Sequence, residues 1–414
     1  MSGNERQLLR KGRPLWLSGA SGPPLLRYAA LKDRLEADVA IVGGGITGAL
    51  VACTFAEAGV SVVLLEGARV GCGSTAASSA LLLQEPDHGM AQLAERYGSR
   101  ISHRLWQSSR AAVGDFIALL RRRRIACDLV ERDAIYYATE AAAVERLRRE
   151  LGFRTRAGFE AEWLTPGAIR MATGIAARAA IRTSGSAQLN PYRACLGLVA
   201  AAASSGAQIF EGSPVRRITP ARDRVRVHTA SGHVDAARVV VATGYATAHF
   251  RPLVGRFRMY RTYVLATRPL GRSERKEVGL GDVMVWDTER PYHYARWTAD
   301  HRLLMGGEDR LVEPGQRRGA QFVRATADLR RHFEALLPAV ADIPIEAAWE
   351  GLFALTPDSL PYIGPHRRYP GHLFALGYGG NGMTFSFLAA RMLLEQWQGV
   401  RAADHHLFRF GRLR

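Results

Sequence analysis

Residues 38–66 read DVAIVGGGITGALVACTFAEAGVSVVLLE. The apolar run Asp38–Val42 is typical of a buried parallel strand. It leads into Gly43–Gly48, which fits the pattern GxGxxG, and then into an apolar helical segment. A second strand, Ser61–Leu65, ends at Glu66. This order predicts a dinucleotide site, because the helix N-terminus attracts a pyrophosphate and the acid binds the ribose hydroxyls.

The composition is that of a globular chain. Of 414 residues, 47% are hydrophobic and 23% are charged, which excludes an intrinsically disordered chain. Apolar runs such as Val60–Leu65 are far shorter than the roughly 20 residues that span a bilayer, so no membrane span is expected. The four cysteines have no metal-binding or disulfide spacing, and Met1–Pro14 does not resemble a secretory signal. We therefore expect a cytoplasmic protein without a metal site.

The formal net charge is +18, and arginine carries nearly all of it, because the sequence has three lysines, Lys11, Lys32 and Lys276. The arginines are spread along the chain, with one dense run at Arg121–Arg124. We interpret this run as the end of a helix, where cations are favourable. DNA is not expected as a partner and RNA is disfavoured, since the sequence has no separate RNA-binding module. Polynucleotide binding that weakens steeply with salt would support an RNA role.

A loop of small and hydroxylated residues follows the second strand. It reads GCGSTAASSA over residues 71–80, and such a loop lets an extended ligand approach closely, with Ser74 and Thr75 able to bond it. Much later, Val234–Ala242 predicts a further parallel strand, and Gly244 at its end lets the backbone come close to a cofactor. The chain thus leaves the nucleotide-binding domain for a long excursion and then returns to it.

Two C-terminal motifs extend the pattern. Residues 349–364 read WEGLFALTPDSLPYIG, and residues 377–384 read GYGGNGMT. With Gly43–Gly48, Glu66 and the loop after it, they resemble the FAD-dependent D-amino-acid oxidase superfamily, in particular its glycine oxidase, sarcosine oxidase and gamma-glutamylputrescine oxidase branches. The resemblance runs from about residue 37 to residue 398. It implies an α/β fold with a Rossmann-like FAD-binding domain (GR2 type) and an α+β substrate domain built on an antiparallel sheet.

The resemblance also implies domain boundaries. We expect an N-terminal arm over residues 1–36. The FAD-binding domain is expected to be discontinuous, over 37–110, 190–248 and 346–414, and the substrate-binding domain to comprise 111–189 and 249–345. Residues from about 88 to 190 look largely helical at first, whereas those from about 250 to 345 carry strand-like runs.

The family's FAD-binding positions carry over onto matching residues of this sequence. Glu66 is expected to bind the adenosine ribose, and the Val215 backbone to read the adenine. The last helix should point its N-terminus at the flavin, where a positive helix end stabilises the anionic reduced ring. The full set of expected FAD contacts is Gly43, Gly45, Ile46, Gly48, Glu66, Ser74, Thr75, Val215, Gly244, Gly379, Gly380, Asn381, Gly382, Met383 and Thr384.

The catalytic candidates come from the expected substrate domain. Tyr292–Trp297 alternates aromatic and polar residues, so one face can line a cavity. Arg296 is the candidate for binding a substrate carboxylate, because a guanidinium matches it bidentately. Tyr294, Tyr263 and Arg261 are weaker candidates. Thr384 is included because the sarcosine oxidase branch carries a lysine there, whereas His293 is interpreted as a packed histidine.

The family chemistry is oxidation of a C–N bond in an amine or amino acid, by hydride transfer to flavin N5, giving an imine that hydrolyses. Two departures from the sarcosine oxidase pattern matter. Gly351 replaces the flavin-linking cysteine, so non-covalent FAD is expected. Thr384 replaces the lysine, which leaves O2 and a quinone or carrier protein open as electron acceptor. Methylglycine is disfavoured as a substrate.

Three other functions stay open. The same fold would suit a flavin dehydrogenase of a hydroxy acid or of a glycerol-phosphate type substrate. It would also suit a flavoenzyme that modifies tRNA side chains. A third possibility is a flavin-binding subunit that has lost catalysis.

Overall fold

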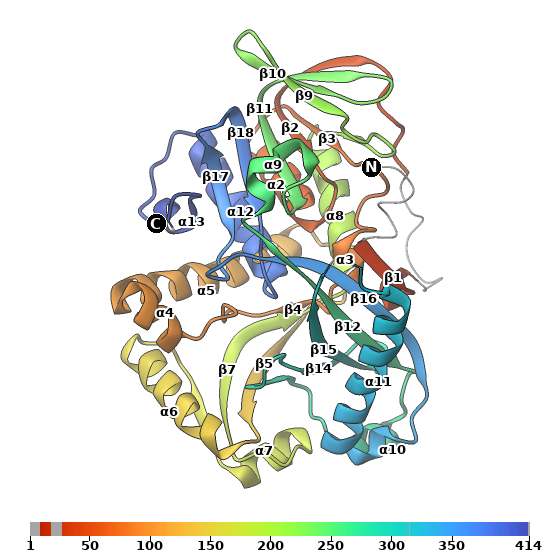
Figure 1. Ribbon diagram of the computed structural model, residues 1–414, viewed down its shortest axis with the longest axis vertical. Coiled ribbons are helices and arrows are strands. Elements are labelled where there is room, and N and C mark those ends of the chain that lie inside the picture. Colours follow the sequence, from red (N-terminus) through yellow and green to blue (C-terminus); the bar gives the residue numbers. More distant parts are fainter. Residues whose placement is uncertain (1–8, 18–26, 314, 413–414) are drawn as a thin grey trace.

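The computed structural model describes residues 9–17, 27–313 and 315–412. Two β-sheets organise the chain, one of eight strands and one of ten. Figure 1 shows the eight-stranded sheet in the upper half of the molecule and the ten-stranded sheet in the lower half. The expected mixed α/β architecture is confirmed.

The eight-stranded sheet is built around the stretch that contains the glycine motif. Its central strands are parallel to one another, as expected for buried apolar runs. In spatial order they are β17 (Tyr362–His366), β18 (Tyr369–Leu376), β11 (His233–Gly244), β2 (Arg34–Val42), β3 (Val62–Leu65) and β8 (Gln208–Phe210), and β10 (Arg224–His228) joins β11 to β9 (Arg217–Ala221). One face is covered by the helices α2 (Ile46–Glu57), α8 (Pro191–Ser204) and α12 (Gly382–Trp397).

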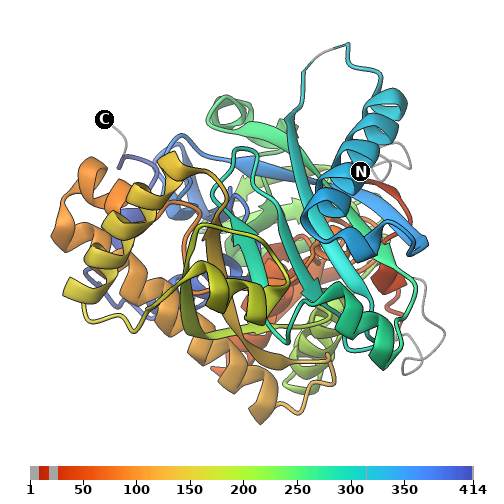
Figure 2. The same cartoon turned by 90° about the horizontal axis from the view of Figure 1, so that it is seen from below.

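The ten-stranded sheet is mostly antiparallel, with one parallel pair between β13 and β5. In spatial order its strands are β1 (Arg10–Gly12), β16 (Ile345–Leu355), β12 (Arg258–Thr267), β15 (Leu303–Leu311), β14 (Tyr294–Trp297), β13 (Met284–Asp287), β5 (Val130–Ala138), β7 (Ala179–Gln188) and β4 (Leu81–Leu82), with β6 (Glu162–Leu164) beside β7. Figure 2 shows α11 (Arg318–Leu336) against one end of this sheet and α6 (Ala141–Arg156) against the other. The remaining helices are α3 (Ser74–Ala77), α4 (Met90–Tyr97), α5 (Ser99–Arg122), α7 (Pro166–Thr173), α9 (Arg251–Val254), α10 (Arg272–Val278) and α13 (His405–Phe408), with three short 3-10 turns at Leu15–Leu17, Ala248–Phe250 and Pro338–Val340.

The expectation that residues 88–190 are largely helical is wrong in part. Helices α4, α5, α6 and α7 are present, but β5, β6 and β7 lie among them. Strand β7 has buried residues on both faces and carries small side chains, so its sequence lacks the alternation that marks a half-buried strand.

Two expected domain boundaries also differ from the structure. A boundary at 110/111 would cut helix α5 in two, and strand β16, which begins at Ile345, pairs with β12 in the ten-stranded sheet. The arm likewise joins that sheet, because β1 pairs with β16. Trp16 Nε1 then donates a hydrogen bond to Ser78 O at 2.8 Å, so this part of the arm packs on the body. Residues 1–8 and 18–26 of the expected arm lie outside the described residues.

The arginine run does end a helix, as expected. Helix α5 ends at Arg122, and the arginines of its last turn and of its C-cap are engaged in ion pairs. Arg121 pairs with Glu131, and Arg122 and Arg123 pair with Glu57. Across the described ranges, no helix is both long and apolar enough to cross a membrane.

Candidate active site

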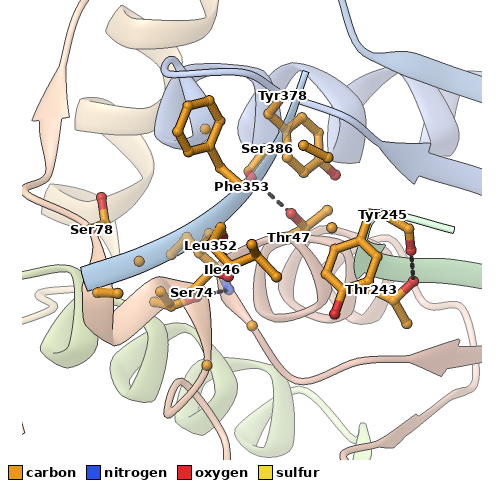
Figure 3. A pocket seen from close by; sticks show the side chains of 18 of the residues that line it. Ile46, Thr47, Ser74, Ser78, Thr243, Tyr245, Leu352, Phe353, Tyr378 and Ser386 are labelled. Carbon is orange, nitrogen blue, oxygen red and sulfur yellow. Dashed lines mark hydrogen bonds between the residues drawn. The ribbon is translucent and has the colours of Figure 1, made fainter. Parts of the chain in front are cut away.

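A cavity of about 1020 Å³ lies where the two sheets meet. Its walls come from segments that are far apart in the sequence. The residues that line it include Gly43, Gly45, Ile46, Glu66, Cys72, Ser74, Thr75, Val215, Gly244, Glu85, Asp87, Tyr136, Arg154, Trp286, Arg290, Tyr292, Tyr294, Asp309, Gly351, Phe353 and Gly379–Met383. Figure 3 shows Ile46, Ser74 and Phe353 around part of this space.

The glycine motif forms one end of the cavity. Gly43 has φ +109°, and a Cβ there would lie 2.7 Å from Ala242 O, so this tight turn needs glycine. Helix α2 then begins at Ile46 without a side-chain cap, and Gly45 and Ile46 line the cavity. A helix N-terminus at a cavity is suited to a phosphate group, because its backbone amides and its positive dipole end face the ligand.

The predicted ribose-binding acid lies beside that helix end. Glu66 Oε2 accepts a hydrogen bond from Gly44 N at 2.8 Å, and Oε1 accepts one from Ala68 N at 2.7 Å. These two backbone donors fix the carboxylate at the end of β3, where it lines the cavity. Binding of the adenosine ribose by Glu66 stays a prediction.

The small-residue loop follows the glycine motif along the cavity wall. Thr75 Oγ1 accepts from Ile46 N at 2.9 Å, and Ser74 Oγ donates to Leu352 O at 2.9 Å. In the loop before β9, Val215 O accepts a hydrogen bond from His249 Nε2 at 3.2 Å. Ser74, Thr75 and Val215 therefore all lie at the cavity, whereas Gly48 does not line it.

The second glycine loop is held by a segment that the sequence analysis did not identify, residues 83–87. Gly380 N donates to Asp87 Oδ2 at 2.7 Å, Asn381 Nδ2 donates to Glu85 O at 2.8 Å, and Thr384 Oγ1 donates to Leu83 O at 2.7 Å. Thr384 is fully buried and does not line the cavity. Its hydroxyl thus positions the loop. In the sequence, the feature that could have indicated this contact is Asp87, an acid shortly after the small-residue loop.

Arg296 does not occupy the place expected of a carboxylate-binding residue. Its side chain is 2% exposed and absent from the cavity lining. The guanidinium donates to Ser79 O at 2.8 Å, to Leu189 O at 3.0 Å and to Trp297 O at 3.1 Å, and it lies over the Trp16 ring. The Arg296 guanidinium therefore donates its hydrogen bonds to backbone carbonyls and has a structural role.

Of the other catalytic candidates, Tyr294 lines the cavity. Tyr263 is fully buried away from it, and Arg261, also outside the lining, lies 3.5 Å from Glu350 in an ion pair. The structure therefore brings one of the five predicted catalytic side chains, Tyr294, to the cavity.

His293 is packed, as expected. Its Nδ1 lies 2.9 Å from Asp287 Oδ2, and its ring stacks on His332 with centroids 3.6 Å apart and planes inclined by 18°. These three residues are grouped closely enough to suggest metal ligands. Nearly parallel rings prevent one ion from lying in the plane of both imidazoles, however, so the stack does not form a metal site.

The far end of the cavity is aromatic and acidic. Tyr136 and Trp286 stack with centroids 5.3 Å apart, and Tyr292 and Tyr294 follow at 6.0 Å from each other. Burial raises the pKa of Asp87 to about 6, and burial together with the charge of Asp87 raises the pKa of Asp309 to about 7.

The residues present fit FAD. The N-termini of helices α2 and α12 both face the cavity, and neither N-cap residue caps its helix with its own side chain. The Oδ1 atom of Asn381, at the start of α12, is buried without a hydrogen-bond partner. Thr47 and Ser386 join these two helices by a hydrogen bond of 2.8 Å (Figure 3). A Cβ at Gly379 or Gly380 would lie 2.2 Å from Asp87 or Tyr292, so side chains cannot fill that wall.

Comparisons with known proteins agree with this geometry. The family model DAO, described as FAD dependent oxidoreductase, matches residues 38–396. Gamma-glutamylputrescine oxidoreductase of Escherichia coli (strain K12) is 29% identical over 92% of this chain and 88% of its own length. Glycine oxidase of Geobacillus kaustophilus (strain HTA426) is 28% identical, over 86% of this chain and 92% of its own.

Solved structures show the same likeness. The crystal structure of glycine oxidase from Geobacillus kaustophilus superposes with a TM-score of 0.79 at 25% identity, covering 92% of this chain and all of that one. L-amino acid deaminase from Proteus vulgaris, at 15% identity, shares the fold with a TM-score of 0.75 over 94% of this chain and 99% of its own. Because this family model matches most of the chain, the chain belongs to the DAO family of FAD-dependent oxidoreductases.

Proposed function

We propose that this enzyme holds FAD non-covalently and oxidises a C–N bond of an amine or amino acid. The observation that carries the proposal is one cavity that runs from the glycine motif of α2 to an end walled by Tyr292 and Trp286. Two relatives are named as a glycine oxidase and a gamma-glutamylputrescine oxidoreductase, and both names denote compounds with an amino group or an amine-derived nitrogen.

Non-covalent binding is supported by the residues at the cavity wall. Gly351 lines the cavity, and a Cβ there would lie 2.9 Å from the Ala77 Cβ. All four cysteines are among the described residues, and Cys72 is the one that lines the cavity. Burial raises the pKa of its thiol, which disfavours the reactive thiolate.

The chain's own residues would position both reactants. When bound, FAD supplies a two-electron acceptor for the hydride of the substrate α-carbon. The N-terminus of α12 would place a positive helix end beside it, and Glu66 would anchor the nucleotide at the far end. The aromatic side chains of the substrate end would exclude water and hold the substrate C–H in position.

The electron acceptor is proposed to be O2 or a quinone or carrier protein. None of the three lysines, which all lie in described segments, lines the cavity. The hydroxy-acid, glycerol-phosphate and tRNA alternatives are not favoured by the relatives found, and Arg121–Arg123 are engaged in ion pairs. A cytoplasmic location stays a prediction from the sequence.

The test is an absorbance spectrum of the purified protein before and after acid precipitation, followed by anaerobic addition of pooled amino acids and polyamines. Flavin that leaves with the supernatant would support non-covalent binding, and bleaching by one pool would identify the substrate class. A colourless protein that FAD cannot reconstitute would refute the proposal. A yellow protein that no amine bleaches would refute amine oxidation while leaving the flavin site intact.

A further inference from the structure

We propose that Asp87 and Asp309 form an ammonium-binding site at the substrate end of the cavity, which selects amines that lack an α-carboxylate. The inference rests on the proposed function, because it names the substrate class of the same cavity. Both carboxylates line that cavity, Asp87 from the segment after β4 and Asp309 from β15.

The charge of Arg290 lowers the pKa of Asp87 and the charge of His293 lowers the pKa of Asp309, but neither cation lies within ion-pair distance of these carboxylates. Asp87 accepts a hydrogen bond from Gly380 N at 2.7 Å, and the Oδ1 atom of Asp309 is buried without a hydrogen-bond partner. Over the described segments, neither carboxylate forms an ion pair with arginine, lysine or histidine. Two neighbouring carboxylates with no cation are costly to keep ionised, and a bound cation would remove that cost.

The other charges at this end do not supply the missing cation. Arg154 is 2% exposed and lies 3.3 Å from Glu85, which is 4% exposed, so their charges offset each other. Glu85 Oε2 is also buried without a partner, which leaves a further acceptor at the cavity. Arg290 also lines the cavity and its charge lowers the pKa of Asp87, but burial of Asp87 outweighs that charge. The Arg290 side chain is exposed, donates to Glu289 O at 2.7 Å and lies 5.9 Å from the Tyr292 ring centre.

The aromatic walls favour the same ligand. The rings of Tyr136, Trp286, Tyr292 and Tyr294 all line the cavity, and aromatic faces attract an ammonium group. Burial raises the pKa of both aspartates, which is the state expected of acids that lack a bound cation.

A substrate carboxylate is disfavoured by the same arrangement. It would face Asp87 and Asp309 at close range, and like charges repel strongly where water is excluded. Arg296, the guanidinium expected to hold it, is committed to three backbone carbonyls. The site therefore discriminates by charge between an amine and an α-amino acid.

The experiment measures binding without turnover. The FAD-loaded protein is titrated at pH 8 by calorimetry with 2-methylpropan-2-amine, which has no α C–H and cannot be oxidised, and with 2,2-dimethylpropanoate, its carboxylate counterpart of the same shape. We expect the amine to bind more tightly than the carboxylate. Asp87→Asn and Asp309→Asn should each weaken amine binding about tenfold or more, since a hydrogen bond to a charged group is lost.

Two further variants test whether the effect is specific to Asp87 and Asp309 and whether Arg290 contributes to binding. Asp115→Asn, at an exposed ion pair on α5, should bind the amine like the unaltered protein. Arg290→Gln should leave amine binding undiminished. Tighter binding of the carboxylate, its loss in Arg290→Gln, or unchanged amine binding in both aspartate variants would overturn the inference. Amine binding without flavin bleaching by any oxidisable amine would instead refute the proposed function alone.

Discussion

Gly45 and Gly48 belong to one motif but serve different purposes. A Cβ at Gly48 would lie 1.8 Å from Gly43 O, and that backbone is fixed because Gly43 N donates to Leu65 O at 2.9 Å. A Cβ at Gly45 would meet a single side-chain atom, Thr75 Oγ1, at 3.2 Å, on the cavity wall. One glycine thus permits helix–strand packing and the other permits ligand approach.

Substituting these two glycines should separate folding from FAD binding. We expect Gly48→Ala to lower the free energy of unfolding by about 3 kcal/mol or to prevent folding, because the added methyl overlaps backbone. Gly45→Ala should fold normally but bind FAD about tenfold more weakly or worse, because the methyl occupies ligand space. Thermal melts and flavin fluorescence on dilution give the two readouts. Equal effects of both variants on folding would contradict this division.

At Asp309, function and stability should oppose each other. Burial raises the pKa of this acid from 3.8 to about 7 in the folded protein, so the folded state holds the proton more tightly than the unfolded state. Stability should therefore fall as pH rises between about 4 and about 7. Asp309→Asn removes the ionisable group and should raise the free energy of unfolding of the ligand-free protein at pH 8 by on the order of 2 to 4 kcal/mol.

Urea unfolding of wild type and Asp309→Asn at pH 4.5 and pH 8 measures this effect. The gain should shrink at the lower pH, where wild-type Asp309 is protonated in the folded state. Asp115→Asn should show no gain at pH 8. A variant less stable than wild type at pH 8 would mean that the hydrogen bond that Asp309 accepts from the Thr262 side chain outweighs the cost of burying its charge.

Helix α11 docks on the β13–β14 connection through the stacked rings of His332 and His293. Burial alone would lower the pKa of His293, but its hydrogen bonds to Asp287 and Glu308 outweigh burial and raise it above 6.5. The imidazolium therefore contributes stability that is fully present below pH 6.5 and is lost as pH rises through the raised pKa. His332, whose pKa burial lowers, acts in the opposite sense at acid pH.

His293→Asn should accordingly cost more stability at pH 6 than at pH 9, by about 1 kcal/mol for each unit by which the pKa is raised. Chemical unfolding of wild type and variant at both pH values gives the difference. His405, which pairs with Glu395 near the C-terminus, provides a matched control. The same comparison for His405→Asn shows how much of the stability difference between the two pH values arises at another paired histidine. A cost that is greater at pH 9 would show that His293 is neutral in the fold.

Local pattern predicts some of these elements much better than others. The motif helix and its flanking strands are contiguous, so the prediction for 38–66 is confirmed as β2, α2 and β3. Strand β14 alternates and was also anticipated. Strands β5 and β7 were not anticipated. They pair with each other although two helices lie between them in the sequence, and both of their faces carry buried residues, so their sequences lack the alternation of apolar and polar residues that marks a half-buried strand.

At the scale of the whole molecule, the two ends of the cavity also differ in how well the sequence predicts them. The nucleotide end lies close to one contiguous unit, so Gly43, Gly45 and Glu66 were predictable from spacing. The substrate end gathers Asp87, Tyr292 and Asp309 from three segments that only the packing of the ten-stranded sheet brings together. No spacing rule reports such contacts. Arg296 was misplaced because it shares a face of β14 with Tyr294 but lies two residues further along the strand, beyond the cavity, and the strand pattern does not say how far along that face the cavity extends.

A cofactor held between both sheets should stabilise them as one unit. The cavity walls include Glu66 beside the eight-stranded sheet and Gly351 in the ten-stranded sheet, so bound FAD would contact both and bind the folded state alone. Free FAD at a hundred times its Kd should then add about 2.7 kcal/mol to the free energy of unfolding. Scanning calorimetry across FAD concentrations should show one transition whose Tm rises steadily. Two transitions, with FAD raising only the Tm of one, would mean that the sheets unfold independently and that FAD binds a single domain.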